Sequence, residues 1–295
     1  MPALRHVGDR RLLKNPVLIT MLSGWIDASG AANAAIETLK KATGAELVAT
    51  FDTDTFIDYR ARRPIMELRE GLNTRLRWSV PEIHHGADAN GRDILILSGP
   101  EPDTAWELFV ETVCNFCIEN GVTRSFAIGA YPFATPHTRP PQLSCHSPSP
   151  HVLAEVPFIK NSADVPAGMS AVLEHGLTEH GISALSLWAP VPHYVSTLAY
   201  PAAGAALLSA VQMVAGLVVD VSELVADAQQ QRERIDQLVS ANPEHLEMVR
   251  QLERMFDEAV KSGQIDSRGQ TPASGDAIAA EVERFLREEM GRDNK

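Results

Sequence analysis

Residues 16–27 have the sequence PVLITMLSGWID, in which a largely apolar run stops at a glycine-containing turn. An apolar run of this length, bounded by turn residues, is typical of a strand that is buried on both faces of a sheet. Residues 29–42 follow with helical character, and residues 46–51 form the next expected strand. This order of strand, turn, helix and strand predicts an α/β architecture.

The same alternation continues along the chain. We expect further buried strands at 93–100, 123–130 and 181–189, and helices at 103–120, 167–180 and 201–220. Residues 73–81 alternate between apolar and polar side chains, which predicts an antiparallel strand with one solvent-exposed face. Residues 131–150 contain six prolines and are expected to form a long irregular loop. The sequence therefore predicts an α/β core domain in residues 1–221.

After residue 221 the pattern changes to helical periodicity. The first set of spaced residues is Leu224, Ala228, Gln231, Ile235 and Leu238, and the second is Leu246, Val249, Leu252 and Phe256. Asn242-Pro243 separates the two sets, so we expect two consecutive helices. A last amphipathic helix is expected at 278–290. We interpret residues 222–295 as a helical C-terminal extension that packs on the core or on another subunit.

Composition limits the classes of partner. The chain of 295 residues has a formal net charge of −12, which disfavours binding to nucleic acid or to an anionic membrane surface. Its three cysteines do not suggest a disulfide framework. No apolar run follows a basic start, so we expect no signal peptide and a cytoplasmic location. The apolar stretch 202–219 is interrupted by small and polar residues, which favours a buried helix over a membrane span.

Two candidate sites lie in the first part of the chain. Trp25 and Asp27 lie in a strand-to-helix turn. Either Asp27 or Ser29 caps the helix, or the turn binds an anion at the helix N-terminus. Residues 52–64 place carboxylates before arginines, with Asp58, Tyr59, Arg60 and Arg63 as candidate binding residues. Arginine suits bidentate capture of phosphate or carboxylate, and the alternative is an internal salt-bridge network.

Glu101 and Asp103 are a third candidate, as paired carboxylates for acid–base chemistry. In the alternative interpretation, Asp103 is the N-cap of the following helix and Glu101 lies near the positive helix end.

A fourth candidate is the proline-rich loop. In this loop His137 supplies a proton donor, and the nearby Arg139 supplies a group that pairs with an anion. His193-Tyr194 lies in a segment of similar composition at the end of a different expected strand. The catalytic candidates are His137 and Asp27. The sequence has no GxSxG, Walker, GxGxxG or HExxH motif, and we predict neither a cofactor nor a metal. Cys114 and Cys117 form a CxxC pattern within a helix, which favours two buried residues over a zinc site.

Five segments together resemble the proteasome assembly chaperone 2 family in its bacterial branch. They are Gly24-Trp25-Ile26-Asp27-Ala28, Asp58-Tyr59-Arg60 with Arg63-Pro64, Ser98-Gly99-Pro100-Glu101-Pro102-Asp103, Pro136-His137-Thr138-Arg139-Pro140 and Val191-Pro192-His193-Tyr194-Val195. The resemblance implies a three-layer α/β/α domain of the phosphorylase/hydrolase-like type, and self-association with a homotrimer as the expected state. Eukaryotic relatives are chaperones for the proteasome α-ring.

The resemblance does not extend to the C-terminal tail. Many eukaryotic relatives carry a hydrophobic–tyrosine–any-residue tail that docks into proteasome pockets, whereas residues 291–295 are Gly-Arg-Asp-Asn-Lys. We do not expect docking by that mode. For the bacterial members the resemblance implies no activity.

Two functions from different classes follow. The first is a homo-oligomeric protein-interaction or assembly factor, with itself and proteasome subunits or other proteins as partners. The second is an enzyme or small-molecule binder that acts on an anionic, nucleoside-like or phosphate-like substrate at the carboxyl ends of the strands. In the second hypothesis Arg60, Arg63 and Arg139 hold the anion, His137 moves a proton and Asp27 orients a hydroxyl or amine.

Overall fold

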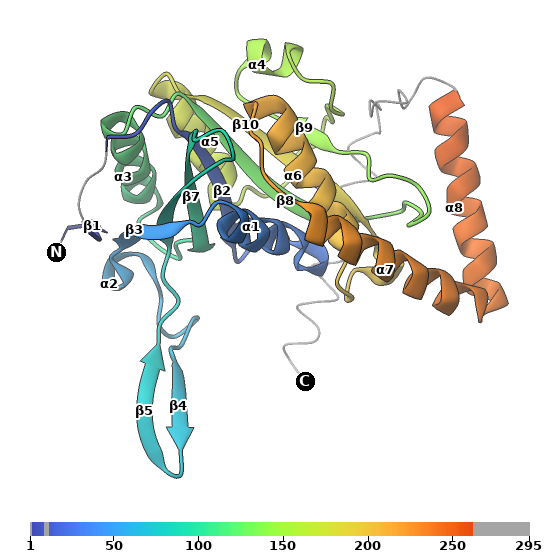
Figure 1. Cartoon of the computed structure of the whole chain (residues 1–295), viewed down its shortest axis with the longest axis horizontal. Helices are drawn as coiled ribbons and strands as arrows, with labels where there is room; N and C mark the ends of the chain where they lie inside the picture. The colour runs from blue at the N-terminus through green and yellow to red at the C-terminus, as the bar shows by residue number, and fades with distance from the viewer. Residues whose placement is uncertain (1, 9–11, 262–295) are drawn as a thin grey trace.

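Four parallel strands form the centre of the protein in a computed structural model that describes residues 2–8 and 12–261 (Figure 1). The apolar run that opens the core is β2 (Val17–Ser23), and it pairs in parallel with β7 (Asp93–Pro100) and β8 (Arg124–Phe133). β10 (Ser183–Pro192) continues the parallel set beside β8. These strands, with the helices between them, confirm the α/β class.

Antiparallel strands complete an eight-stranded sheet on both edges. The strand order is β1-β3-β6-β7-β2-β8-β10-β9. The antiparallel strands are β1 (Leu4–His6), β3 (Glu46–Phe51), β6 (Glu82–Ala87) and β9 (Ser144–His146), of which β1 and β9 form the two edges. β9 lies within the stretch expected to be irregular throughout, where the backbone of Ser144, Cys145 and His146 pairs with β10. β6 had no clear apolar pattern in the sequence, and it is held by pairing with strands on both sides.

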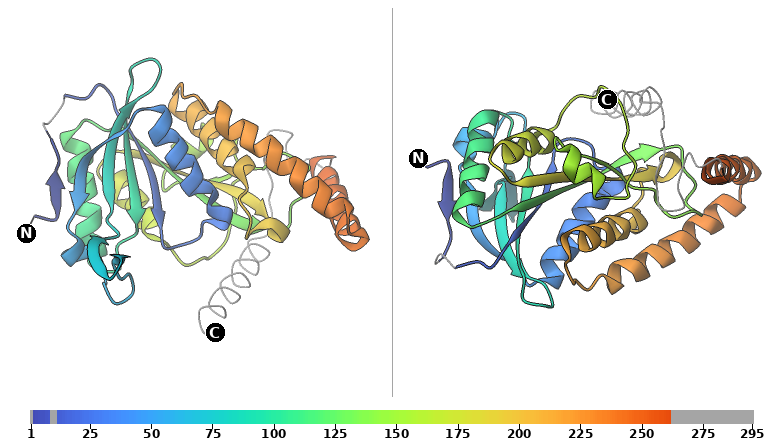
Figure 2. Two further views of the ribbon diagram at one scale, coloured as in Figure 1. Left: turned by 60° about the horizontal axis from the view of Figure 1, so that its bottom comes forward. Right: turned by 90° about the horizontal axis from the view of Figure 1, so that it is seen from above.

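Helices cover both faces of the sheet, which confirms the three-layer α/β/α architecture (Figure 2). α1 (Ala31–Ala42) and α6 (Pro201–Ala215) pack on one face, and α3 (Trp106–Glu119) and α5 (Met169–Glu179) pack on the other. The shorter helical segments are η1 (Ala28–Gly30), α2 (Thr53–Phe56), α4 (Pro150–Ala154) and η2 (His193–Val195).

The side chains of β2 divide between the two layers because a strand alternates its faces. Val17, Ile19 and Met21 point to the α1 and α6 side, and Leu18 and Leu22 point to the α3 and α5 side. Thr20 lies between Leu18 and Leu22 in the strand. It is polar, yet only 1% of its surface is exposed.

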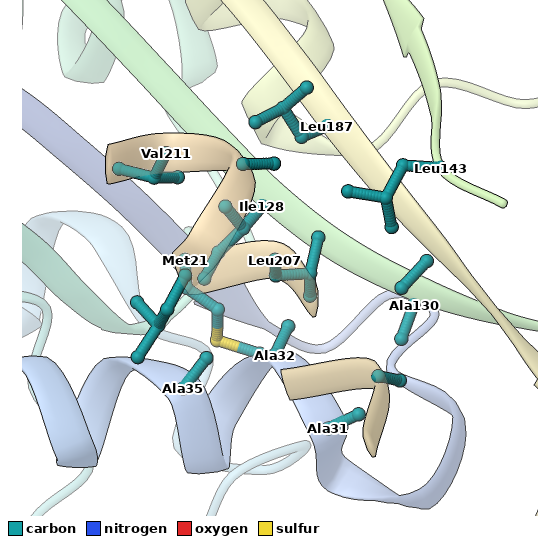
Figure 3. Close-up of a cluster of buried hydrophobic side chains, with 14 of the residues drawn as sticks. Met21, Ala31, Ala32, Ala35, Ile128, Ala130, Leu143, Leu187, Leu207 and Val211 are labelled. Atoms are coloured by element: carbon teal, nitrogen blue, oxygen red, sulfur yellow. The ribbon is translucent and has the colours of Figure 1, made fainter. Parts of the chain in front are cut away.

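Small residues allow α1 and α6 to approach each other closely. Figure 3 shows Ala31, Ala32 and Ala35 of α1 beneath Leu207 and Val211 of α6. At Gly204 of α6, an added Cβ would lie 2.9 Å from the carbonyl oxygen of Ala31, so a larger residue would push the helices apart.

Two further helices follow the core, as expected. α7 (Ser222–Ser240) packs on α6, and α8 (Pro243–Lys261) runs across the end of α7 (Figures 1 and 2). The expected apolar face of α7 is partly wrong, because Leu238 is 61% exposed whereas Val239 is buried. The helix expected at 278–290 lies outside the described residues. Within residues 2–8 and 12–261, no helix combines the length and apolar character that a membrane span needs.

A β-hairpin projects from the body of the protein (Figure 1). β4 (Ile65–Arg69) and β5 (Leu72–Arg77) pair with each other in a separate two-stranded sheet. Every residue of β5 is exposed, so the expectation of one buried face at 73–81 is wrong. The alternating apolar side chains of this segment are therefore not buried in a core within the described part of the chain.

Candidate functional site

Asp27 acts locally as a helix cap. Its two carboxylate oxygens accept from the backbone N–H groups of Ala32 at 2.8 Å and Asn33 at 3.0 Å in the first turn of α1. Burial raises the pKa of Asp27, although both N–H groups favour its charged form. The carboxylate is therefore engaged with the helix that follows it.

The arginine-rich loop is organised around Arg62 rather than Arg60 or Arg63. Arg62 donates to the carbonyl oxygen of Glu101 at 2.7 Å and lies 3.2 Å from Asp103. Arg60 and Arg63 are exposed to solvent.

Hydrogen bonds within the loop and to Asp103 hold the same loop in place. Asp58 accepts from the backbone N–H of Arg60 through its side chain, and its own N–H donates to Asp103. Tyr59 contacts Asp54 and Thr53 through its hydroxyl. These hydrogen bonds, with the Arg62–Asp103 ion pair, connect the loop to the end of β7.

The carboxylates at the end of β7 have separate partners. Asp103 does not cap α3, because that helix begins at Trp106 with Ala105 as its N-cap. Glu101 instead accepts from the backbone N–H of Met169 at 3.0 Å, at the start of α5. A carboxylate at this place offsets the positive end of the helix dipole.

His137, Arg139 and Tyr194 connect the core to the C-terminal helices. Nδ1 of His137 lies 2.7 Å from the hydroxyl of Tyr194, and Nε2 lies 2.9 Å from Asp236 of α7. Arg139 forms ion pairs with Glu253 and Asp257 of α8.

The partners of His137 define its tautomer. The carboxylate of Asp236 only accepts, so Nε2 of His137 carries the proton, and in the neutral imidazole Nδ1 then accepts from the hydroxyl of Tyr194. The same hydroxyl accepts from the backbone N–H of His137. Burial raises the pKa of Tyr194. His193 is exposed and contacts the ring of Tyr194.

A cleft of about 350 Å³ lies beside the carboxyl halves of β2, β8 and β10. The loop at 163–168 and the first turn of α5 form its other wall. Of the residues expected at a site, Trp25 and Glu101 line this cleft, and Asp27, Asp58, Tyr59, Arg60, Arg63, Asp103, His137, Arg139, His193 and Tyr194 do not. The position agrees with the rule that ligands of α/β sheets bind at the carboxyl ends of the strands.

Aromatic rings form much of the cleft surface. Trp25, Tyr131 and Trp188 all line it, and the rings of Tyr131 and Trp188 are 6.5 Å apart. Two glycines allow the indole rings to lie directly on the backbone: an added Cβ would be 2.6 Å from Trp188 at Gly129 and 3.0 Å from Trp25 at Gly168. Burial raises the pKa of Tyr131, so its hydroxyl remains protonated near neutral pH.

A hydrogen-bonded chain runs along one side of the cleft. Nε1 of Trp188 donates to Nε2 of His146 at 3.0 Å, and Nδ1 of His146 lies 2.8 Å from Oε2 of Glu174. Because an indole nitrogen is only a donor, Nε2 of His146 accepts and Nδ1 carries the proton. Glu174 is 5% exposed although it is a carboxylate.

Cys145 also lines the cleft but is a poor nucleophile near neutral pH, since burial raises the pKa of its thiol to about 11. Cys114 and Cys117 are buried in α3, as expected. Across residues 2–8 and 12–261, no group of three or more His, Cys, Asp or Glu side chains is arranged to hold a metal ion.

Comparison with known families agrees with the fold. The PAC2 family model matches residues 21–239, which is more than half of the chain. The chain belongs to the PAC2 family. The resemblance inferred from the five segments is confirmed. No curated protein matches the chain.

Three solved structures show what this chain is similar to. A Mycobacterium tuberculosis protein of unknown function is 32% identical with a TM-score of 0.82, over 89% of this chain and 93% of the other. A PAC2 family protein from Streptomyces avermitilis is 30% identical with a TM-score of 0.72, over 79% and 99%. A proteasome-assembly chaperone homologue from M. tuberculosis is 28% identical with a TM-score of 0.73, over 79% and 99%.

Sequence reasoning missed the polar side of the cleft in this PAC2 protein. One signal was available: Glu174 lies between Leu173 and Leu177 on the apolar face of the expected helix at 167–180. An acidic residue on a buried helix face needs a partner, and here that partner is His146.

Proposed function

We propose that this PAC2 protein is a homo-oligomeric interaction or assembly factor, with a trimer as the favoured state. It acts in the cytoplasm, and its partners are other protein chains, with proteasome subunits as the first candidates. The observation that carries this proposal is the exposed β4–β5 hairpin. The M. tuberculosis proteasome-assembly chaperone homologue, similar over 79% of this chain, supports the choice of partner class.

The hairpin has the properties of a contact surface. Its exposed apolar side chains are Ile65, Met66, Leu68, Leu72, Leu76 and Trp78, each with 45–69% of its surface exposed. A lone two-stranded hairpin is at best marginally stable in water, and exposed apolar side chains gathered on one projecting element are typical of an interaction site. A second copy of the chain would cover them and stabilise the hairpin.

The C-terminal helices offer a second surface. Val225 and Leu238 of α7 and Met255 of α8 are 50–61% exposed, although both helices also bury residues against the core. The side that faces away from the core is available to a partner protein, and we assign it to the assembled target rather than to self-association.

Static light scattering on size-separated protein tests the oligomer directly. The variant carries Leu68→Gln and Leu72→Gln in the hairpin, and its matched control carries Leu108→Gln and Ile118→Gln on α3, which are also exposed. We expect a trimer mass for the wild type and the control, and the mass of one chain for the hairpin variant. A wild type that already has the mass of one chain would contradict the proposal.

Affinity capture from the native host at native abundance tests the partner. We expect proteasome subunits to be enriched with the wild type and lost with a variant that carries Leu238→Gln and Met255→Gln. If the wild-type protein is a trimer but captures no other protein, that result would contradict the assembly role. It would leave the proposal of self-association intact.

The alternative function is that of an enzyme or small-molecule binder. It needs a different set of residues from the one expected from the sequence. Asp27 caps α1, Arg60 and Arg63 are exposed on another loop, and His137 is engaged with α7. Binding of a small molecule is supported instead by the cleft that Trp25 and Glu101 share with Trp188.

A further inference from the structure

The inner end of the cleft is a small polar cavity. This cavity has a volume of about 10 Å³ and shares Ala127, Ser170 and Ser186 with the wall of the cleft. A volume near this size accommodates one small group, such as a water molecule or an amino group. The large and the small spaces therefore adjoin each other across these shared residues, with aromatic side chains around the large one and polar side chains in the small one.

Three buried oxygen atoms at this inner end have no hydrogen-bond partner within the described part of the chain. They are Oγ1 of Thr20, Oε1 of Glu174 and Oγ of Ser186. The three residues are only 1%, 5% and 2% exposed. Buried polar atoms without partners are costly, so a native protein retains them where something else satisfies them.

The charge of the site favours a donor or a cation. Glu174 receives a hydrogen bond from a neutral His146, because Trp188 donates to the other ring nitrogen. The carboxylate is thus hydrogen-bonded through Oε2 but not neutralised. Glu101 at the rim adds a second acidic group, and no lysine or arginine occurs among the described residues that line the cleft.

An anionic ligand has no comparable support. The N-terminus of α5 faces the cleft and would attract an anion, but the carboxylate of Glu101 already accepts from its first N–H group. A bound anion would therefore lie beside two carboxylates and the negative field that they produce.

We propose that the cleft binds a small planar aromatic molecule with an amino group or a protonated nitrogen. The ring lies against the indoles of Trp25 and Trp188, and the nitrogen donates to Glu174, Ser186 and Thr20 in the inner cavity. A primary ammonium has three N–H donors, which match the three oxygen atoms, and a cationic group is also attracted to indole faces. This site is independent of the hairpin surface.

Calorimetric titration with matched probes tests the proposal. Tryptamine, benzylamine and 2-aminobenzimidazole supply an aromatic ring with a donor nitrogen, and indole-3-propionic acid supplies the ring with a carboxylate. We expect at least one amine to bind about tenfold or more tightly than the acid. Binding of the acid as tightly as the amines would overturn the proposal, and so would the absence of binding by all three amines, as for a cavity that holds only water.

Two variants with matched controls locate the bound nitrogen. Glu174→Gln removes the buried charge, and its control Glu179→Gln makes the same change at an exposed position of the same helix. Ser186→Ala removes a buried hydroxyl, and its control Ser183→Ala lies on the exposed start of the same strand. We expect the two site variants to weaken amine binding, by about tenfold for Glu174→Gln, and the controls to leave it unchanged. Equal affinities for Glu174→Gln and Glu179→Gln would overturn the assignment.

Stability without ligand gives a separate measurement. Thr20→Val replaces a hydroxyl that has no protein partner by a methyl group of similar shape, so we expect an unchanged or higher Tm together with weaker amine binding. A lower Tm with unchanged amine binding would show that the hydroxyl serves the core and would remove it from the proposed site.

Discussion

Arg139 and Asp257 form a bidentate ion pair that connects the proline-rich loop to α8. Nε of Arg139 lies 2.9 Å from Oδ1 of Asp257, and Nη2 lies 2.8 Å from Oδ2. Glu253, one turn earlier on α8, lies 3.2 Å from Nη1 of the same guanidinium. The loop expected to carry a ligand site thus serves as the attachment point of the last described helix.

Removing this pair should loosen α8 more than it destabilises the whole protein. The side chains of Arg139 and Asp257 are 30% and 43% exposed, so we expect Arg139→Gln to cost less than about 1 kcal/mol. Hydrogen exchange should show faster exchange in residues 243–261 and unchanged exchange in α1. Arg250→Gln, on the exposed face of α8, is the control. Equal exchange of α8 in wild type and Arg139→Gln would contradict the prediction.

The same ion pair predicts a pH dependence with a definite sign. The hydrogen bond from Arg139 lowers the pKa of Asp257 below its ordinary value of 3.8. Because the folded pKa is depressed, the contribution to stability is complete above pH 3.8 and is lost as the pH falls through the folded value. An NMR titration of the Asp257 carboxyl should give a midpoint below 3.8 in the wild type and a higher midpoint in Arg139→Gln. Identical midpoints in the two proteins would contradict this account.

His137 should behave as a structural residue. Its side chain is 1% exposed and has hydrogen-bond partners on both ring nitrogens. We expect His137→Ala to lower the free energy of unfolding by about 2–4 kcal/mol, since it opens a cavity and leaves the hydroxyl of Tyr194 without its acceptor. His193→Ala, at an exposed position, should change it by less than about 0.5 kcal/mol. Denaturant unfolding measures both, and an unchanged midpoint for His137→Ala would point to a functional role instead.

Asp88 should be a strong local determinant of stability. Its carboxylate accepts from the backbone N–H groups of Asn90 and Arg92 at 2.9 Å and of Val218 at 3.0 Å. Although burial raises the pKa of Asp88, these hydrogen bonds outweigh it and the net shift is downward. We expect Asp88→Ala to cost about 2–4 kcal/mol, because three backbone donors lose their acceptor. Asp88→Asn keeps one acceptor oxygen and should cost less. Equal unfolding midpoints for Asp88→Ala and the wild type would contradict the prediction.

The layered fold could be predicted because its signal is local. Val17 to Leu22, apart from Thr20, and Ile94 to Leu97 are apolar on both faces, and such runs need helices on both sides of the sheet. β6 and β9 lacked this signal, because Glu82, His84 and His146 are polar and the strands are held by backbone pairing with neighbours. The sequence of the hairpin alternates as in a half-buried strand, but its apolar side chains are exposed.

The candidate site was predicted only in part. Trp25 and Glu101 line the cleft, and the capping of α1 by Asp27 was one of the two interpretations of its turn. The cap is readable from sequence because its partners lie 5 and 6 residues away.

The sequence by itself determined the alternation of strands and helices, the family and the helical character of residues 222–261. The tertiary structure alone decided which polar side chains meet. Glu174 reaches His146 across 28 residues, and His137 reaches Asp236 across 99. Such pairs depend on the order of strands in the sheet and on where helices dock, and hydrophobic periodicity carries information about burial but none about these distant neighbours.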